Sequence, residues 1–306
     1  MSKKIVFMGT PSFAVPCLEA LNNSNHKVIS VYSQPASKAN RGQKLVKSKI
    51  EIFANKFSLN IRTPSNLDNE EEYRFLSSIK PDIGVVVAYG KIIPKKILSI
   101  PKHGFLNVHA SLLPKWRGAA PIQRSIMNLD KETGISIMKI VEKLDAGPIM
   151  SQDKIKINEN VDSFILSELL SKLGAKSIIT AIKKIENNEA NFHEQNDKEA
   201  TYAKKISKNE AEINWNQNAK IILAKINALN PNPGAWFKHK NERYKVWKAN
   251  LAKGLGEPGK VLDGKLKICC QESAINIIKI QKEGKSIQDI DQFLLGNKIK
   301  EGEILV

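Results

Sequence analysis

Two polar side chains with complementary chemistry stand two residues apart in the first half of the sequence. Residues 105–108 are predicted to form a short strand that ends next to His109, so Asn107 and His109 would point to the same face of a sheet. A carboxamide beside an imidazole can donate a hydrogen bond to a developing oxyanion and move a proton. The same pair can also simply cap a strand end, and the spacing alone leaves both interpretations open.

A carboxylate that could join this pair lies further along the chain. Asp145 falls in Leu144-Asp-Ala-Gly-Pro-Ile149, which is predicted to be a loop between two strand-like segments. A carboxylate next to His109 would orient the imidazole and favour its charged form. Asp before Ala-Gly-Pro is also typical of an ordinary turn. The three side chains therefore form a candidate site only if the fold brings them together.

The elements that must position these residues alternate between strand and helix. A continuous apolar strand such as Ile83 to Ala88 is typical of a parallel sheet covered on both faces. The carboxyl ends of such strands are where open α/β sheets place their sites. We therefore predict a doubly wound, mostly parallel, Rossmann-like α/β domain at the N-terminus. Its predicted strands are 4–8, 26–32, 83–88, 105–108 and 135–141, and its predicted helices are 13–22, 45–57, 68–80 and 162–185.

The character of the sequence changes towards the C-terminus. The stretch 189–207 is polar and charged, and we interpret it as a linker between a catalytic domain at 1–188 and a second domain at 208–306. After one predicted helix, 216–229, short strand-like pieces punctuated by Gly and Pro predict a small β-barrel of the OB type. Trp236 and nearby aromatic side chains could stack on bases, although strands bury such residues routinely.

Charge and cysteine content narrow the classes of protein that the sequence can encode. The formal net charge is +17, with 42 lysines and 6 arginines. This excess favours a polyanionic partner, but it can equally reflect the base composition of a genome. Three cysteines, including the adjacent pair Cys269 and Cys270, do not form a disulfide framework, so we expect a cytoplasmic protein. We predict no membrane span, no metal site and no dinucleotide loop, because Gly9-Thr-Pro-Ser-Phe-Ala14 lacks G-x-G-x-x-G.

Several motifs together resemble one family of enzymes. The run Asn107-Val-His-Ala-Ser-Leu-Leu-Pro114, followed by Leu-Asp-Ala-Gly-Pro-Ile around Asp145, is similar to the signature of the formyltetrahydrofolate-dependent formyltransferases. Further segments resemble those members that formylate methionyl-tRNA. These segments are Phe7 to Pro16, Arg41-Gly-Gln-Lys-Leu45, Pro81 to Gly90 and Ala228-Leu-Asn-Pro-Asn-Pro-Gly-Ala-Trp236. The chain departs from the family at Ile226-Asn227-Ala228, where the usual arginine is absent, and in its own loop near Ser37 to Asn40.

The resemblance implies a reaction and a set of residues for it. The co-substrate would be 10-formyltetrahydrofolate, and the acceptor would be the α-amine of methionine on initiator methionyl-tRNA. Asn107 and His109 would stabilise the oxyanion, and Asp145 would hold His109 charged and assist proton transfer. The folate would lie along the Tyr89 strand end and the loop formed by Ser111, Leu112, Leu113 and Pro114.

A basic loop is the predicted contact with tRNA. Segment 37–50 carries five basic residues and no acid, and the resemblance favours Arg41 and Lys44 as phosphate contacts. A solvated lysine-rich loop is the plainer interpretation of the same residues. The C-terminal segment 207–306 has a net charge of +6, which is moderately basic. We predict a monomer with these two substrates and no membrane partner.

Two other functions use the same sequence features. A formyltransferase for a sugar nucleotide or another small amine would share Asn107, His109 and Asp145. The basic Arg41 segment favours the tRNA substrate over this alternative. A non-catalytic RNA-binding protein with the same fold is the other alternative, and the intact candidate triad argues against it.

Overall fold

A computed structural model describes residues 2–39, 44–296 and 299–305 of the chain. The chain divides into two compact units. The first comprises Met1–Gly118, Thr133–Ile155 and Ser167–Tyr202, and the second comprises Ala119–Glu132, Lys156–Leu166 and Ala203–Val306. The domain boundaries predicted from the sequence, with a linker at 189–207 between domains at 1–188 and 208–306, remain a prediction.

The first unit is built on a seven-stranded sheet with the order β10-β9-β7-β6-β1-β2-β5. The strands are β1 (Lys4–Gly9), β2 (Lys27–Tyr32), β5 (Ile61–Arg62), β6 (Ile83–Val87), β7 (Phe105–His109), β9 (Glu132–Lys139) and β10 (Ile149–Lys156). Pairing is parallel from β5 through β7, and β9 runs antiparallel to β7. The mostly parallel, Rossmann-like fold predicted for this part is therefore confirmed.

Apolar strands covered on both faces explain the centre of this sheet. Every residue of β6 is buried, and so are five of the six residues of β1. Strands of this kind are stable only when helices cover both sides, as in parallel sheets generally. Strands β2 and β5 lie on one side of β1, whereas β6 and β7 lie on the other, so the strand order reverses between β1 and β6. In open α/β sheets, ligands bind at the carboxyl ends of the strands at such a point.

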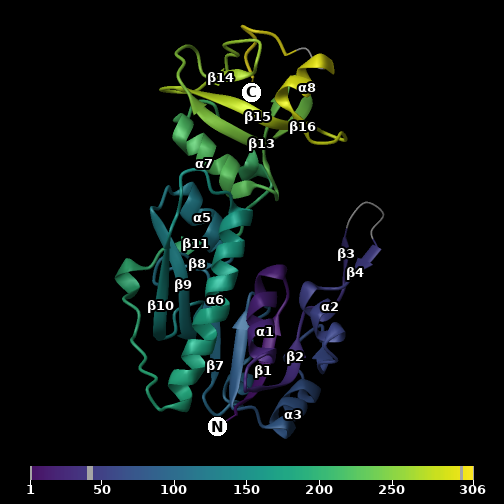
Figure 1. The fold of residues 1–306 in the computed structure, drawn as a ribbon, viewed down its shortest axis with the longest axis vertical. Helices are drawn as coiled ribbons and strands as arrows, with labels where there is room; N and C mark the ends of the chain where they lie inside the picture. Colours follow the sequence, from purple (N-terminus) through teal and green to yellow (C-terminus); the bar gives the residue numbers. More distant parts are fainter. Residues whose placement is uncertain (1, 40–43, 297–298, 306) are drawn as a thin grey trace. The chain divides into compact units, whose positions relative to one another are not determined.

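Helices cover the sheet of the first unit. They are α1 (Val15–Asn22), α2 (Lys49–Lys56), α3 (Glu70–Ile79), α4 (Lys95–Leu98) and most of α6 (Ser163–Glu186). In Figure 1, α1 and α6 run along one face of the sheet. A Cβ added to Gly174 of α6 would lie 2.8 Å from Val108 Cγ1, so the helix sits directly on this strand. Because side chains alternate along a strand, Asn107 and His109 must point to the opposite face from Val108.

One predicted helix, 45–57, is too long at its N-terminal end. Lys44–Val46 forms strand β4, which pairs antiparallel with β3 (Ser37–Ala39), and α2 begins only at Lys49. Leu45 and Val46 are exposed, so their apolar character does not reflect a buried helix face. Ser48 caps the helix, since its hydroxyl accepts a hydrogen bond from the Glu51 amide at 2.9 Å.

The second unit contains a five-stranded antiparallel sheet, as expected for a β-rich C-terminal part. Its order is β12-β13-β15-β14, with β16 paired to β15. The elements are α5 (Pro121–Met127), α7 (Ala219–Leu229), β12 (Ala235–His239), β13 (Glu242–Ala252), β14 (Lys267–Cys269), β15 (Ala274–Lys282), β16 (Gln288–Asp289) and α8 (Ile290–Gly296). Residues 260 and 261 form only isolated bridges, Lys260 to Ile304 and Val261 to Ile268, rather than a strand.

The aromatic side chains of the second unit belong mainly to its core. Trp236, Phe237 and Tyr244 are buried, and Phe237 stacks on Tyr244 with ring centroids 5.5 Å apart. Trp247 is half-buried, and its indole N–H donates to Gln281 Oε1 at 2.9 Å. Packing therefore explains these aromatics, and no stacking on bases needs to be invoked for the buried ones.

A substitution at Gly84 of β6 would test how tightly β6 packs against β7 in the sheet. A Cβ at this position would lie 2.1 Å from Phe105 Cδ1 at the start of β7. We expect Gly84→Ala to lower the free energy of unfolding by about 1–3 kcal/mol, as overpacked core substitutions do. Gly264→Ala is the matched control, because no atom of the described residues lies within 4 Å of its added Cβ. Urea unfolding of both variants would measure the difference, and equal stabilities would contradict the packing argument.

Candidate active site

Asn107, His109 and Asp145 converge in the structure. Asn107 Nδ2 donates to Asp145 Oδ1 at 3.3 Å, and His109 Nδ1 lies 3.7 Å from Asp145 Oδ2. The His109 and Asp145 side chains are only 6% and 14% exposed, respectively. An amide, an imidazole and a carboxylate from two separate segments thus lie together at the face of β7 opposite the one that α6 contacts.

The hydrogen bonds of His109 define which ring nitrogen carries a proton. Nε2 lies 3.0 Å from the carbonyl oxygen of Trp116. A carbonyl only accepts hydrogen bonds, so Nε2 must be the protonated nitrogen in the neutral ring. This leaves Nδ1 facing the Asp145 carboxylate, where it can accept or release a proton without moving the ring.

The Asp145 carboxylate is held from two sides. Its Oδ2 accepts a hydrogen bond from the backbone N–H of Gly118 at 2.9 Å, while Oδ1 accepts from Asn107. Asp145 itself has a left-handed backbone, with φ of 46°, which is costly for a residue with a Cβ. Such a conformation persists only where surrounding contacts hold it, and two N–H donors on its carboxylate are part of that support.

Close packing dictates the turn that follows Asp145. A Cβ added to Gly147 would lie 1.9 Å from the carbonyl oxygen of Lys139, at the end of β9. Only glycine lets the two backbones approach so closely. The predicted loop around Asp145 is therefore present, and its glycine brings the returning chain back against β9.

The loop after β7 is tied down by buried hydroxyl groups. Ser136 Oγ donates to the Ser111 carbonyl at 2.7 Å and accepts from the Leu113 amide at 3.0 Å. Gln152 Nε2 donates to the Leu113 carbonyl at 2.8 Å. The Ser111 and Leu113 side chains are buried, whereas Leu112 and Pro114 are half-buried. These bonds fix the backbone of the segment predicted to contact folate.

The Tyr89 strand end belongs to the same edge of the sheet, but its side chain is in the core. The ring is 1% exposed, and burial raises the pKa of its phenol above the ordinary range. Its carbonyl accepts hydrogen bonds from Thr10 Oγ1 and Gln34 Nε2, both at 2.9 Å. These bonds tie together the loops that follow β1, β2 and β6.

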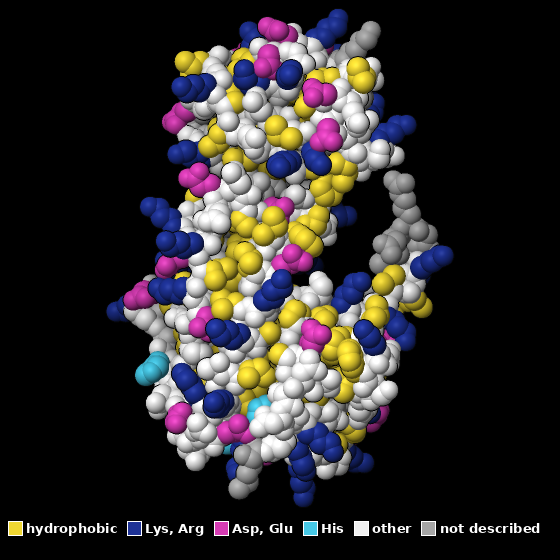
Figure 2. Space-filling view, in the orientation of Figure 1, with side chains coloured by type: hydrophobic (Ala, Val, Ile, Leu, Met, Phe, Trp, Pro, Cys, Tyr) yellow, Lys and Arg dark blue, Asp and Glu magenta, His cyan; other side chains and the backbone are white. Residues whose placement is uncertain are grey.

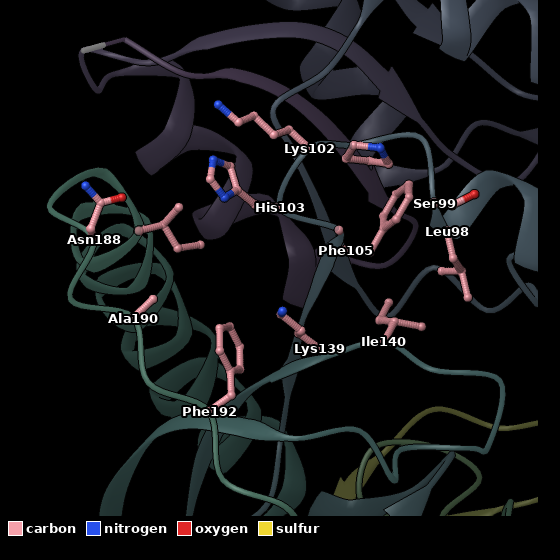
Figure 3. A pocket seen from close by; sticks show the side chains of 13 residues that line it. Leu98, Ser99, Lys102, His103, Phe105, Lys139, Ile140, Asn188, Ala190 and Phe192 are labelled. Atoms are coloured by element: carbon pink, nitrogen blue, oxygen red, sulfur yellow. The ribbon is translucent and has the colours of Figure 1, made fainter.

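A pocket of about 590 Å³ opens at the other end of β7 (Figure 3). Lys102, His103 and Lys139 are among the residues that line it, and burial lowers the pKa of His103. Phe105 begins β7 and lines this pocket, whereas His109 ends the strand. The pocket therefore lies at the amino end of β7, away from the predicted catalytic residues.

Of the two predicted tRNA contacts, the structure describes Lys44, which falls on the β3–β4 hairpin. Lys44 is the first residue of β4 and is exposed. Figure 2 shows basic side chains, which are lysines in the described part of this hairpin, beside hydrophobic ones at the right of the view. Arg41 lies outside the described residues.

No metal or membrane feature was found in the part of the chain that the structure describes. That part holds no group of three or more His, Cys, Asp or Glu side chains placed to bind a metal ion. Among its helices, none has both the length and the apolar character needed to cross a bilayer.

Sequence reasoning missed two side chains that contact the site loops. Gln195 and Thr201 lie in the segment interpreted as a linker. Gln195 Nε2 donates to the Asp145 carbonyl at 2.9 Å, and Thr201 Oγ1 accepts from the Trp116 amide at 2.9 Å. A polar residue in a polar stretch gives no signal of such a contact, so the pattern alone could not have identified them.

Comparison with known proteins places these features in one family. The family described as Formyl transferase matches residues 3–182, and the Formyl transferase C-terminal domain matches residues 205–298. The chain is 52% identical over 304 residues to a methionyl-tRNA formyltransferase of Pelagibacter ubique, covering 99% of this chain and 98% of the relative. It is 41% identical over 303 residues to the methionyl-tRNA formyltransferase of Paramagnetospirillum magneticum, covering 99% of each.

Solved structures share the fold at lower identity. HypX from Aquifex aeolicus, in complex with tetrahydrofolic acid, has a TM-score of 0.67 at 16% identity and covers 98% of this chain and 50% of its own. An N-formyltransferase from Helicobacter canadensis, in complex with folinic acid and dTDP-3-aminofucose, has a TM-score of 0.66 at 20% identity and covers 92% of this chain and 100% of its own. With two family domains matched in order and full-length relatives above 40% identity, the chain belongs to the formyl transferase family.

Proposed function

We propose that this chain transfers the formyl group of 10-formyltetrahydrofolate to the α-amine of methionine on initiator methionyl-tRNA. The product would be N-formylmethionyl-tRNA, which serves translation initiation. The observation that carries the proposal is the 52% identity, over 99% of the chain, to a relative named methionyl-tRNA formyltransferase. The proposal is supported by a site whose amide, imidazole and carboxylate suit formyl transfer to an amine.

The site geometry suggests a role for each candidate catalytic residue. The amine attacks the formyl carbon and gives a tetrahedral intermediate whose oxygen becomes negative. The Asn107 carboxamide has two N–H groups. One donates to Asp145 Oδ1, so the other can donate to the oxyanion. Asp145 and the Nδ1 atom of His109, 3.7 Å apart, can hold the proton that the attacking amine loses until the departing folate nitrogen takes it. No covalent enzyme intermediate is required.

The predicted folate residues differ in how they could contact a pterin. Leu112 and Pro114 are half-buried and offer apolar surface, while Ser111, Leu113 and Tyr89 have buried side chains. The last three would therefore support the shape of the site, because their side chains are buried and their carbonyls already accept internal hydrogen bonds. Because hydrogen bonds already fix the backbone of this loop, the loop would lose little conformational entropy when a ligand binds. The relative with tetrahydrofolic acid bound, HypX, has the same fold.

Lys44 is the described residue that we propose as a tRNA phosphate contact. Its position on an exposed hairpin suits a point charge that neutralises a phosphate. Neighbouring Lys47 is engaged with Glu51 through an i,i+4 pair of 3.1 Å, so its charge is partly compensated. We propose Arg41 as the second contact on the basis of the family resemblance alone.

Lys44→Ala is expected to weaken tRNA binding uniformly and to reduce its salt dependence. The slope of log Kd against log salt should fall by about one, the value for one lost phosphate contact. Lys27→Ala is the matched control, because Lys27 is exposed at the amino end of β2, whereas the β3–β4 hairpin follows the carboxyl end of that strand. Filter binding between about 50 and 200 mM salt would measure both slopes. An unchanged slope for the Lys44 variant would remove it from the interface.

The acceptor amine decides between this proposal and a small-molecule formyltransferase. The protein should be mixed with 10-formyltetrahydrofolate, charged initiator tRNA and a UDP-amino sugar as competitor. N-formylmethionine released from the tRNA after mild base treatment is the expected product, and uncharged tRNA is the control. Formylation of the sugar alone would show that the acceptor is a sugar nucleotide, and no formylation at all would favour a binding protein.

We also propose that the protein acts in the cytoplasm as a monomer, with no membrane partner. Its cysteines, Cys17, Cys269 and Cys270, are all buried and free, which suits a reducing compartment. Sedimentation of the purified protein would test the monomer, with a dimer mass as the contradicting result.

A further inference from the structure

The polar segment between α6 and α7 packs against both loops of the candidate site. His193 exchanges two backbone hydrogen bonds with Ile149 at the start of β10, at 2.8 and 2.9 Å. Further along, Thr201 pairs with the loop after β7, because its carbonyl accepts from the Arg117 amide at 2.9 Å. This stretch therefore fixes the Asp145 loop at one end and the Trp116 loop at the other.

Gln195 is the side chain of this segment that faces the Asp145 turn. Its Nε2 donates to the carbonyl oxygens of Asp145 and Gly147, at 2.9 and 2.7 Å. Its Oε1 accepts from Arg117 Nε at 3.0 Å. The carboxamide thus uses both of its N–H groups and its oxygen within one corner of the site.

Arg117 determines the orientation of this amide. A guanidinium only donates hydrogen bonds, so the Gln195 oxygen must face it and the NH₂ group must face the two carbonyls. Arg117 is 1% exposed, and its second contact is an ion pair of 2.8 Å with Asp197 in the same segment. The reversed amide would place an oxygen against two carbonyl oxygens and an NH₂ against a cation.

The two carbonyls that Gln195 binds bracket the strained turn of the site. Asp145 has a φ of 46°, and Gly147 is pressed against the Lys139 carbonyl. Left-handed residues other than glycine need such external support. A hydrogen bond to the Asp145 carbonyl therefore fixes the peptide plane from which the catalytic carboxylate projects towards Asn107 and His109.

We infer that Gln195 is a positioning residue for formyl transfer: it holds the Asp145 turn so that the carboxylate meets Asn107 and His109. This inference rests on the proposed function, because its kinetic test measures the rate of formyl transfer. Gln195 does not touch the reacting atoms itself, and Arg117 acts one step further out by fixing the orientation of its amide.

Gln195→Glu is the sharpest variant, because it keeps the shape and the acceptor for Arg117 but removes both N–H donors. We expect kcat to fall roughly 10- to 100-fold, the range for two lost hydrogen bonds, while KM for the tRNA changes by less than about twofold. Gln195→Met removes the donors without adding charge and should show the same division between kcat and KM. The neighbouring exposed Glu194→Gln is the matched control and should behave as wild type.

A double-mutant cycle separates positioning from a general structural effect. If Gln195 acts only by placing the Asp145 carboxylate, its substitution should cost little in an Asp145→Asn background. Single-turnover rates with excess enzyme would measure the residual activity. A full, additive loss in that background, or wild-type kcat for both Gln195 variants, would overturn the inference.

A substrate-free readout keeps this test separate from the proposed function. The ¹⁵N chemical shifts of the His109 ring report which nitrogen carries the proton, and they respond to the carboxylate beside Nδ1. Gln195→Glu and Gln195→Met should change these shifts, whereas Glu194→Gln should not. Wild-type protein that formylates no tRNA would refute the proposed function, while unchanged His109 shifts in both variants would refute the positioning role.

Discussion

Asp145→Asn is expected to reduce formyl transfer on the order of 10³-fold, within the range for loss of a positioned acid–base group. The carboxylate oxygens accept hydrogen bonds from Asn107 Nδ2 at 3.3 Å and from the Gly118 amide at 2.9 Å. An asparagine has nearly the same shape but only one acceptor oxygen, so its NH₂ group would face one of these donors. It can neither take a proton from the amine nor stabilise a cationic His109.

The loss should appear in chemistry rather than in folding. Single-turnover rates at saturating folate would measure the chemical step, and thermal unfolding would show whether the variant is folded. Glu142→Gln is the matched control, because Glu142 lies in the same loop but pairs with Lys95 at the surface. Activity of Asp145→Asn within a factor of about two of wild type, far below the loss expected for such a group, would remove Asp145 from the mechanism.

The fold of the first unit could be predicted because its central strands obey a simple rule. Ile83–Val87 is continuously apolar in sequence and wholly buried in the structure, as a parallel strand between two helix layers must be. Helical spacing predicted the start of α2 wrongly, because the exposed Leu45 of β4 continues the apolar spacing of the helix into the hairpin. The sequence Ser48-Lys-Ile-Glu51 is a capping signal that marks the true helix start.

The parts of the fold that were missed are those whose pattern is weak. Strand β10 has mostly exposed or half-buried residues, because it lies at the edge of the sheet and lacks the alternation that a covered strand shows. Helix α5 is only seven residues long, too short for a helical period to be distinguished from chance. Edge position and short length, rather than unusual chemistry, explain both omissions.

The candidate site divides in the same way. Spacing placed Asn107 and His109 on one face of a strand. The residues alone offered Asp145 only as one possible partner, and the family resemblance favoured it, since no local pattern links Asn107 to a residue 38 positions away. The structure adds what neither could supply: the segment interpreted as a linker reaches back to the site through Gln195 and Thr201. Such long-range contacts depend on the path of the backbone, which a single sequence does not encode locally.

Asn107→Ala is expected to reduce the rate of formyl transfer by about 10²–10³, the usual effect of removing one oxyanion donor. Asn107 lies in β7 between buried neighbours, paired with Val86 of β6 and Met138 of β9, so its position is fixed before substrate arrives. A donor held in this way stabilises charge in the transition state without reorganising. The loss should therefore fall on kcat, with KM for folate changed by only a few-fold.

The matched control for this prediction is Asn187→Ala, since Asn187 is exposed after α6 and contacts Glu189 at 3.4 Å. Removing Asn107 also removes one of the two donors on Asp145, so part of the loss can come through that carboxylate. Asn107→Ala in the Asp145→Asn background separates the two contributions. A further loss of at least about tenfold there would be the direct oxyanion contribution, within the range for a single donor. The absence of any further loss would reduce Asn107 to a partner of Asp145, and the amide would then have no direct role in stabilising the intermediate.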